Sequence, residues 1–303
     1  MGEIKKKEDE KYLIISLSGG HGKMVMSTAF IRAVKKKYPD RKIIVVAPWD
    51  GPYFYNPNIY RFYLHGEPKY FYDDYIKDKD VIIFNHEVYQ HQDHLLQRRH
   101  LTEIWCDLFN VPYDGPMPEI ILNPREIEIA RDKIKPDNGK PIMLIQSNGG
   151  GSNQYSKKSW ARDIPINIAQ QVVDYFSNDY RILHVRTPEQ PALNNVELLN
   201  LPFRELYAVF TFSKKRLFID SFSQHVSAAL NLPSTVCWIT NKPKVFGYDI
   251  HDNILPNAKI THEFNKFSFL EKFDITGMVQ QFNYDTVDLF DVNQIINSIK
   301  NQK

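Results

Sequence analysis

Short apolar runs alternate with amphipathic segments along most of this chain. Apolar runs typical of buried strands cover residues 12–17, 42–47, 80–84, 141–146, 180–185, 217–219 and 235–239. Helical spacing of apolar residues covers 24–38, 93–109, 125–135, 164–176, 203–212, 226–230 and 288–300. Because strands and helices alternate, the pattern predicts an α/β protein with doubly wound parallel sheets.

Three stretches lack this regular pattern. Residues 48–75 are rich in Pro, Tyr and Asn, which predicts long loops and short helices, and residues 241–284 are irregular and aromatic. Val111 to Pro124 holds four prolines and one glycine without helical or strand spacing. This composition is typical of a boundary between domains. We therefore predict domains at 1–122 and 123–303, with the last helix able to return to the first domain.

Composition narrows the class of partner. The chain has 38 basic and 36 acidic residues, a formal charge of +2, which gives no support to nucleic-acid binding. Its two cysteines, Cys106 and Cys237, lie in apolar stretches and are expected to be reduced core residues. The sequence shows no membrane-spanning run and no signal peptide, so we expect a cytoplasmic protein, with peripheral membrane contact left open.

Four histidines raise the question of a metal site. His86, His91, His94 and His100 lie close together in the sequence. Their spacing is not that of the H-E-x-x-H motif, and no cysteine accompanies them. A structural or acceptor-binding role is therefore favoured over metal ligation.

A glycine-rich turn follows the first predicted strand and contains Gly19, Gly20, Gly22 and Lys23. Glycines at such a turn allow a ligand to approach the backbone closely. Neither common phosphate motif fits, because Leu17 stands where a Walker loop needs glycine and the glycines do not form G-x-G-x-x-G.

A second polar turn, Asp220 to His225, links an apolar run to a helical pattern. The carboxyl ends of parallel strands and the first N–H groups of a helix favour an anionic ligand such as phosphate. The glycine-rich loop that starts at Ser147 and the basic step at Lys158 are candidates for the same ligand. Structural roles stay open: a helix N-cap for Asp220, an internally bonded His225 and an exposed Lys158 without a ligand.

In order along the chain, these pieces resemble the heptosyltransferase-like glycosyltransferases of family 9, which have the GT-B fold. The resemblance is carried by the turn from Gly22 to Ala29, by Lys157-Lys-Ser-Trp160, and by Asp220-Ser-Phe-Ser-Gln-His225 with its following Ala228-Ala-Leu230. It is loose between about residues 48 and 125.

The resemblance implies two Rossmann-like domains facing an interdomain cleft that holds a nucleotide sugar. The donor would be bound by the residues Gly19, Gly20, Gly22, Ser147, Asn148, Gly149, Lys158, Asp220, Ser221, Gln224 and His225. The nucleotide sugar is a co-substrate, and no other cofactor is implied. The reaction would be an inverting, metal-independent transfer of a sugar to a hydroxyl of a glycan or glycolipid.

The sequence departs from the family where the general base is expected. The family has an aspartate at the position of Lys23, and a protonated lysine cannot accept a proton unless burial lowers its pKa. His21, in the same loop, is the first alternative base, and Glu87 or His86 at the end of a later predicted strand is the next. Lys23 is left as a ligand for an anionic acceptor or for the donor phosphates. Phe222 stands in place of the family's glycine after Asp-Ser.

Two other hypotheses compete with glycosyl transfer. The first is a catalytically inactive GT-B protein that binds a nucleotide or a glycan, which Lys23 would allow. The second is another nucleotide-binding α/β enzyme such as an epimerase, which is disfavoured because the chain lacks a dinucleotide loop. The basic residues Lys69, Arg98 and Arg99 are candidates for an acidic or phosphorylated acceptor.

Overall fold

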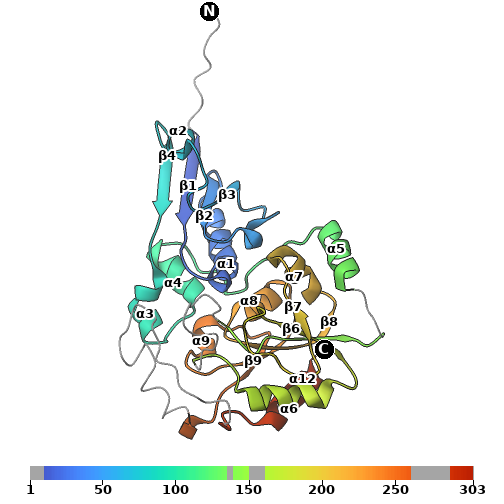
Figure 1. Cartoon of the computed structure of the whole chain (residues 1–303). Coiled ribbons are helices and arrows are strands. Elements are labelled where there is room, and N and C mark those ends of the chain that lie inside the picture. Colours follow the sequence, from blue (N-terminus) through green and yellow to red (C-terminus); the bar gives the residue numbers. More distant parts are fainter. Residues whose placement is uncertain (1–9, 135–138, 150–160, 261–286, 303) are drawn as a thin grey trace, which may run out of the picture. The chain divides into compact units, whose positions relative to one another are not determined.

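The computed structural model describes residues 10–134, 139–149, 161–260 and 287–302. The chain divides into two compact units, residues 1–121 and 122–303. Each unit contains one parallel β-sheet with helices packed on its faces (Figure 1).

The first unit carries a four-stranded sheet in the order β3-β2-β1-β4. Its strands are β1 (Lys11–Ser16), β2 (Lys42–Ala47), β3 (Arg61–Leu64) and β4 (Asp80–Phe84). Its helices are α1 (His21–Lys37), α2 (Phe71–Tyr75), α3 (Gln92–Leu95) and α4 (Leu101–Leu108), with short 3-10 helices η1 (Gly51–Tyr53) and η2 (Val88–Gln90). All neighbouring strands in this sheet run parallel.

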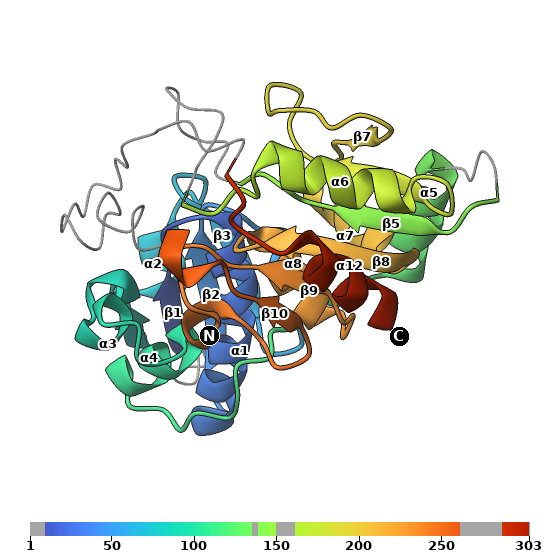
Figure 2. The same ribbon diagram turned by 90° about the horizontal axis from the view of Figure 1, so that it is seen from below.

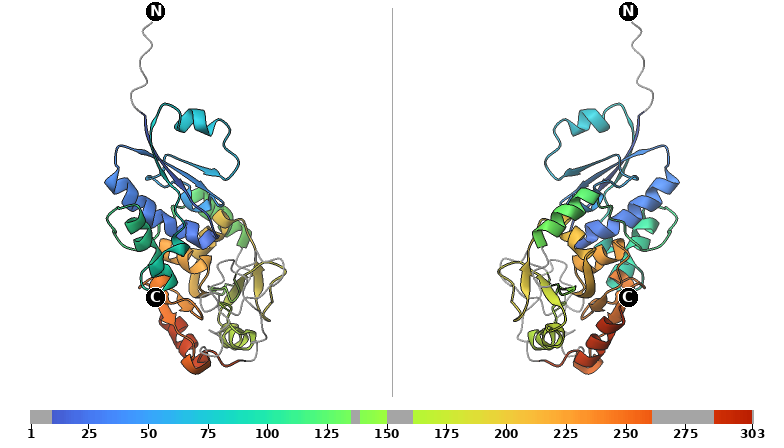
Figure 3. Two further views of the ribbon diagram at one scale, coloured as in Figure 1. Left: turned by 90° about the vertical axis from the view of Figure 1, so that its left-hand side faces the viewer. Right: turned by 90° about the vertical axis from the view of Figure 1, so that its right-hand side faces the viewer.

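The side chains of β1 point alternately to the two faces of this sheet, and each face packs against different helices. Tyr12 and Ile14 pack with Ile44 and Tyr75 on the face covered by α2. The intervening residues point to the opposite face, because successive side chains of a strand alternate. Helix α1 lies on that opposite face, as Figure 3 shows. There Phe30 of α1 stacks on Trp105 of α4 with ring centroids 5.7 Å apart.

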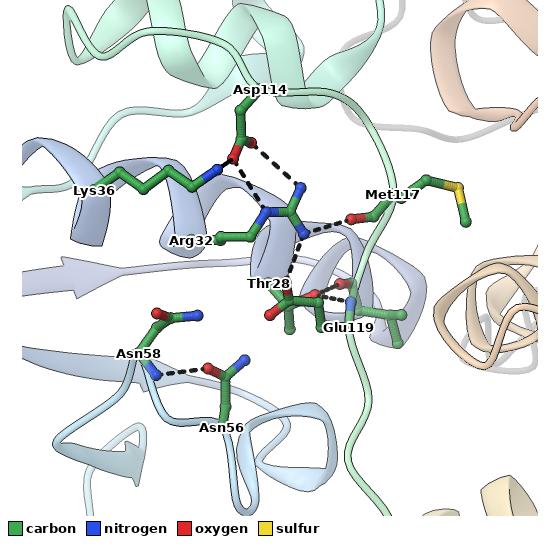
Figure 4. Close-up of polar contacts among 9 residues, drawn as sticks. Thr28, Arg32, Lys36, Asn56, Asn58, Asp114, Met117 and Glu119 are labelled. Atoms are coloured by element: carbon green, nitrogen blue, oxygen red, sulfur yellow. Dashed lines mark hydrogen bonds and ion pairs between the residues drawn. The ribbon is translucent and has the colours of Figure 1, made fainter.

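The segment that leaves the first unit is bound to α1. Arg32 donates to Asp114 Oδ2 (3.2 Å), to the Met117 carbonyl (2.9 Å) and to Glu119 Oε1 (2.7 Å). The Glu119 backbone N–H donates to Thr28 Oγ1 (2.8 Å), as drawn in Figure 4. A proline-rich stretch without secondary structure is thereby fixed along one helix by side-chain hydrogen bonds.

The second unit carries a six-stranded sheet in the order β10-β9-β8-β5-β6-β7. Its strands are β5 (Ile142–Ile145), β6 (Arg181–Val185), β7 (Glu197–Leu199), β8 (Ser213–Ile219), β9 (Thr235–Cys237) and β10 (Asp252–Ile254). Its helices are α5 (Pro124–Ile134), α6 (Ile166–Phe176), α7 (Phe203–Phe210), α8 (Phe222–Ala229), α9 (Pro243–Phe246) and α12 (Val292–Asn301). All neighbouring strands in this sheet are also parallel.

Helices cover both faces of the second sheet. Met143, Leu217 and Cys237 share one apolar core with side chains of α6 and α12, and these two helices lie along the same strands in Figure 2. Helix α7 packs on the opposite face, where Phe210 lies 5.4 Å from Phe218 between ring centroids. A sheet covered on both faces explains why its strands read as continuous apolar runs.

The last helix, α12, belongs to the second unit. Gln302 donates to the Arg216 carbonyl (2.7 Å) and accepts from the Arg216 N–H (2.9 Å). Ser298 and Thr235 hydroxyls lie 2.6 Å apart. The helix is therefore packed on the sheet of its own unit.

Several predicted elements need correction. Strand β3 lies within residues 48–75, where only loops and short helices were expected, and the short strands β7 and β10 were also missed. The helix expected over 93–109 is divided into α3 and α4. The imidazole of His100 accepts from the Thr102 N–H (3.3 Å) and caps α4, so the chain starts a second helix there.

Candidate functional site

Each sheet has a topological switch point, where ligands of open α/β sheets bind. In the first sheet the chain moves from β1 through β2 to β3 and then returns to β4 on the other side of β1. In the second it moves from β5 through β6 to β7 and returns to β8 beside β5. The loops after β1 and β4, and those after β5 and β8, contain most of the candidate residues.

At the first switch point, Glu87 is surrounded by hydrogen-bond donors. Lys23 Nζ lies 2.6 Å from Oε1 and 2.9 Å from Oε2. The Tyr89 backbone N–H donates to Oε1 (3.0 Å), and the Ser18 hydroxyl donates to Oε2 (2.7 Å). Each carboxylate oxygen thus accepts two hydrogen bonds, and the candidates Lys23 and Glu87 form a single ion pair.

The two members of this pair differ in exposure. The Lys23 side chain is 3% exposed and that of Glu87 is 32% exposed. Burial is the largest influence on Lys23 and lowers the pKa of its ammonium, although the bond to Glu87 opposes this. Burial opposes ionisation of Glu87, but hydrogen bonds from Lys23, Tyr89 and Ser18 outweigh it and lower the pKa of the carboxyl. Lys23 Nζ also lies 4.2 Å from the centroid of the Tyr89 ring, a cation–π distance.

The glycine turn is shaped by Lys23. Gly19 has φ +110°, and a Cβ there would lie 2.9 Å from Lys23 Cδ, so glycine is required at this position for two reasons. Gly20 is the N-cap of α1, which begins at His21. The helix therefore starts earlier than the predicted residue 24, and His21, Gly22 and Lys23 lie in its first turn.

His21 is buried within the first unit. Its side chain packs edge-to-face on Trp49, with ring centroids 5.6 Å apart. Burial lowers the pKa of His21 to about 3, so the imidazole is neutral at pH 7. A group with so low a pKa is a weak general base.

The other histidines of this unit have structural contacts. His91 Nδ1 accepts from the Asp93 N–H (3.1 Å) and caps α3, as His100 caps α4. His94 Nδ1 lies 2.9 Å from the Tyr89 carbonyl, and His86 packs edge-to-face on Phe109. Among the described residues, no group of three or more His, Cys, Asp or Glu is arranged to hold a metal ion.

The loop after β5 is fixed by a buried carboxylate. Asp163 accepts from the Gly149 N–H (2.8 Å) and from Asn148 Nδ2 (3.4 Å). Ser147 Oγ donates to Asn148 Oδ1 (2.9 Å) and lies 3.0 Å from His184 Nε2. These contacts hold Ser147, Asn148 and Gly149 in one conformation at the second switch point.

The turn after β8 lies beside this loop. Gln146 Nε2 donates to Ser221 Oγ (3.2 Å), which joins the ends of β5 and β8. Ser221 is the N-cap of α8 but makes no side-chain capping bond, so its hydroxyl does not compete for the first N–H groups of the helix. The Ser223 hydroxyl, in the first turn of α8, is fully buried without a hydrogen-bond partner among the described residues.

Asp220 is held by a different partner. Asn241 Nδ2 donates to its Oδ2 (2.6 Å). Burial raises the pKa of the carboxyl, while nearby Arg162 and the bond from Asn241 oppose that rise. Phe222, which stands in place of the family's glycine, packs edge-to-face on Phe203 of α7.

Gln224 and His225 are buried and face the chain after α9. Gln224 Nε2 donates to the Phe246 carbonyl (2.9 Å), and the Gln224 carbonyl lies 2.9 Å from His251 Nε2. His225 Nδ1 and the Tyr248 hydroxyl are hydrogen-bonded at 2.8 Å. These contacts match the alternative that His225 is satisfied within the fold, and they fix the position of α8.

Arg162 was not among the residues predicted for the site. A Cβ on Gly149 would lie 2.7 Å from Arg162 Cδ, so this arginine passes directly over the loop after β5. It is also close enough to Asp220 to favour the ionised carboxylate. In the sequence, Arg162 is marked only by its position four residues after Lys158. Lys158 itself lies outside the described residues, as do Lys157, Ser159 and Trp160.

Comparisons with known proteins identify the fold. No protein-family model matches the sequence. No curated protein matches it either. Solved structures do match: a family 9 glycosyl transferase from Veillonella parvula covers 96% of this chain and 97% of its own, with a TM-score of 0.66 and 14% identity.

Two Escherichia coli heptosyltransferases match less closely. ADP-heptose LPS heptosyltransferase II covers 87% of this chain and 99% of its own, with a TM-score of 0.57 and 16% identity. Heptosyltransferase WaaC, solved with ADP, covers 88% of this chain and 100% of its own, with a TM-score of 0.51 and 11% identity. In the described part of the chain, no helix has the length and hydrophobicity needed to span a bilayer. The predicted fold class is confirmed: this chain has the two-sheet, all-parallel GT-B fold of the family 9 heptosyltransferases.

Proposed function

We propose that this protein is a glycosyltransferase that moves a sugar from a nucleotide-sugar donor to a hydroxyl of a glycan or glycolipid. The observation that carries the proposal is the Glu87 carboxylate, bound by Lys23 at the switch point of the first sheet. In the family that the chain resembles, the base is an aspartate at the position of Lys23. Here a carboxylate from the neighbouring loop lies against that lysine.

Glu87 is the proposed general base. The acceptor oxygen attacks the anomeric carbon, its proton passes to Glu87, and the nucleotide diphosphate leaves with the electrons of the broken C–O bond. Attack opposite the leaving group inverts the anomeric centre, and no metal takes part in the proposed step. The lowered pKa of Glu87 keeps it ionised at neutral pH, as a base must be.

The Ser18 hydroxyl occupies the place that an acceptor hydroxyl needs. It donates to Glu87 Oε2 (2.7 Å), and Ser18 itself is exposed. If the Ser18 side chain rotates about one bond, an acceptor hydroxyl can take its place as the donor to Glu87 Oε2. Lys23, which is buried, is assigned to hold Glu87 and not to contact the substrate. His21 is the weaker candidate base because its imidazole is buried, whereas the Glu87 side chain is 32% exposed.

The donor residues are proposed from the second switch point. Ser147, Asn148, Gly149 and Ser221 would surround the diphosphate, with Asp220 beside them, and Arg162 would supply a cation from the same loop region. Gln224 and His225 would hold α8 in place. Lys158 and the glycines Gly19, Gly20 and Gly22 remain proposed donor contacts. WaaC was solved with ADP, which makes an adenine nucleotide the first to test.

A second candidate function is nucleotide or glycan binding without turnover. It is favoured by the four hydrogen bonds that Glu87 already accepts, because a carboxylate with both oxygens occupied is a poor proton acceptor. Under this alternative, the Lys23–Glu87 pair only stabilises the first unit.

Nucleotide binding and turnover separate the two functions. Calorimetry with ADP, GDP, UDP and dTDP, followed by an assay of sugar release or transfer from the matching donors, should show binding and slow turnover. Lys158→Ala should weaken binding at least tenfold if Lys158 contacts the diphosphate, whereas the matched control Lys157→Ala should not. Binding without turnover of any donor would favour the binding protein. If no nucleotide binds, the proposed transfer is rejected and only glycan binding is left.

A further inference from the structure

Two exposed aromatic side chains follow strands at the carboxyl edge of the first sheet, the edge at which Glu87 also lies. Trp49 follows β2 and is 40% exposed, and Tyr89 follows β4 and is 37% exposed. Both rings contact the first turn of α1: Trp49 packs on His21, and the Tyr89 ring lies 4.2 Å from Lys23 Nζ, which also binds Glu87. This edge therefore presents two aromatic rings and one carboxylate.

The described basic side chains named as candidates for this edge lie next to carboxylates. Lys23 is buried and paired with Glu87. Arg99, a candidate for an acidic acceptor, is bound by three carboxylates, those of Asp93, Glu103 and Asp107. Arg98 is 59% exposed and lies 4.0 Å from Asp93.

Two flanking loops add no net positive charge. Asp50 directly follows Trp49, and the loop after β3 carries both Glu67 and Lys69. Among the described residues, the chain after these strands thus gathers no cluster of unpaired cations. A phosphate or carboxylate placed here would lie beside Glu87 without a compensating cation, which weakens binding.

A saccharide without charged groups fits the same chemistry. The hydroxyls of a sugar donate hydrogen bonds, and an ionised carboxylate only accepts them. The C–H face of a sugar ring is apolar and slightly positive, and it packs on the negative face of an aromatic ring. An indole, a phenol ring and a carboxylate together provide both kinds of contact.

We infer that the acceptor is an uncharged saccharide, which stacks on Trp49 or Tyr89 and whose reacting hydroxyl donates a hydrogen bond to Glu87. This inference rests on the proposed function and specifies its acceptor. It replaces the earlier expectation that Arg98, Arg99 and Lys69 would suit a phosphorylated or acidic acceptor. Soluble glycans and glycolipid head groups share this chemistry.

Saturation-transfer NMR tests the inference without the donor. The probes are methyl glycosides of glucose, galactose, mannose, rhamnose and N-acetylglucosamine, each paired with a derivative that carries a phosphate. At least one neutral glycoside should bind, and its phosphorylated partner should bind at least about tenfold more weakly at low salt. Trp49→Ala or Tyr89→Ala should abolish binding, while Tyr72→Ala, an exposed aromatic on α2, should not.

The Glu87→Gln variant provides a charge readout. In this variant the ratio of affinities for the neutral and the phosphorylated glycoside should be smaller than in the wild type, because the carboxylate that repels the phosphate is removed. Tighter binding of the phosphorylated probes, unchanged binding in both aromatic variants, or no binding of any glycoside would overturn the inference. A further experiment compares binding of the free glycoside with binding of the same sugar displayed on phosphatidylcholine vesicles. Tighter binding to the vesicles indicates a glycolipid acceptor, and equal binding indicates a soluble glycan. Both outcomes support the inference.

The same preparations separate this inference from the proposed function. If nucleotide binding and donor turnover are present but the protein prefers the phosphorylated probe, only the acceptor assignment fails. If the neutral glycoside binds but no nucleotide does, the proposed transfer fails and the saccharide site remains.

Discussion

Lys23 stands where the resemblance implies an aspartate, and its ammonium is bound by Glu87, which follows a different strand. Both residues could be selected as candidates from the sequence. Their pairing could not be predicted, because it depends on β4 lying next to β1 in the sheet. The spacing of residues along the sequence does not show which strands are neighbours. The burial of His21, which makes it a weak base, was equally hidden.

The Lys23–Glu87 pair is expected to stabilise the first unit. Lys23→Met removes the charge with little change in volume and leaves Glu87 partly buried without its cation. We expect a loss of about 1–3 kcal/mol in the free energy of unfolding, below the cost for a fully buried pair because Glu87 is 32% exposed. Urea unfolding followed by tryptophan fluorescence measures the change.

A double-mutant cycle is the control for this prediction. Glu87→Gln in the Lys23→Met background should cost less than Glu87→Gln alone, since no cation is then left uncompensated. Strictly additive costs would show that the two side chains are not coupled, and would remove the assigned role of Lys23 in holding Glu87.

At the scale of elements, long apolar strands and helices were predictable from periodicity, and short or capped ones were not. Strand β3 has exposed or half-exposed residues throughout, so it lacks the apolar run of a buried strand. The break between α3 and α4 follows from histidine caps, which are not among the usual capping residues. The start of α1 at His21 was not predicted, because its first turn contains glycine and polar residues in place of a periodic apolar pattern.

The segment bound along α1 gives a prediction at this scale. Arg32→Met should destabilise the first unit by about 1–3 kcal/mol, since it leaves Asp114, Glu119 and the Met117 carbonyl without their shared donor. Lys36→Met is the matched control: Lys36 also binds Asp114 but is 66% exposed, so its loss should cost less than about 1 kcal/mol. Equal urea midpoints for the two variants would contradict this account.

At the scale of the whole molecule, the alternation of strands and helices was enough to predict an α/β protein with parallel sheets, and two all-parallel sheets are observed. The resemblance led to the GT-B fold, which the structural matches confirm. Arg162 was missed because its importance comes from passing over Gly149, a contact between a loop and a side chain with no sequence motif.

Buried neutral histidines in both units predict a loss of stability in weak acid. Burial lowers the pKa of His21 and His184 to about 3 and that of His251 to about 4, from an ordinary 6.5. The unfolded chain therefore binds more protons below pH 6.5, and stability falls with pH from 6.5 towards the folded values. Between pH 7 and pH 5, each histidine should cost up to about 2 kcal/mol.

Urea unfolding at pH 7 and pH 5 measures this loss. His184→Gln should reduce the pH dependence of the second unit, because one group that must be neutral in the folded state is removed. A free energy of unfolding that is equal at the two pH values would show that these histidines are not held neutral by burial.

The central claim is that Glu87 accepts the proton during sugar transfer, and the kinetics of Glu87→Gln test it most directly. With the donor that the wild-type protein turns over, we predict that kcat falls by about 10²–10⁴-fold while nucleotide affinity stays within about twofold, since an amide cannot serve as the base. Gln90→Ala, in the same loop, should leave kcat unchanged. Turnover by Glu87→Gln at the wild-type rate would contradict the account.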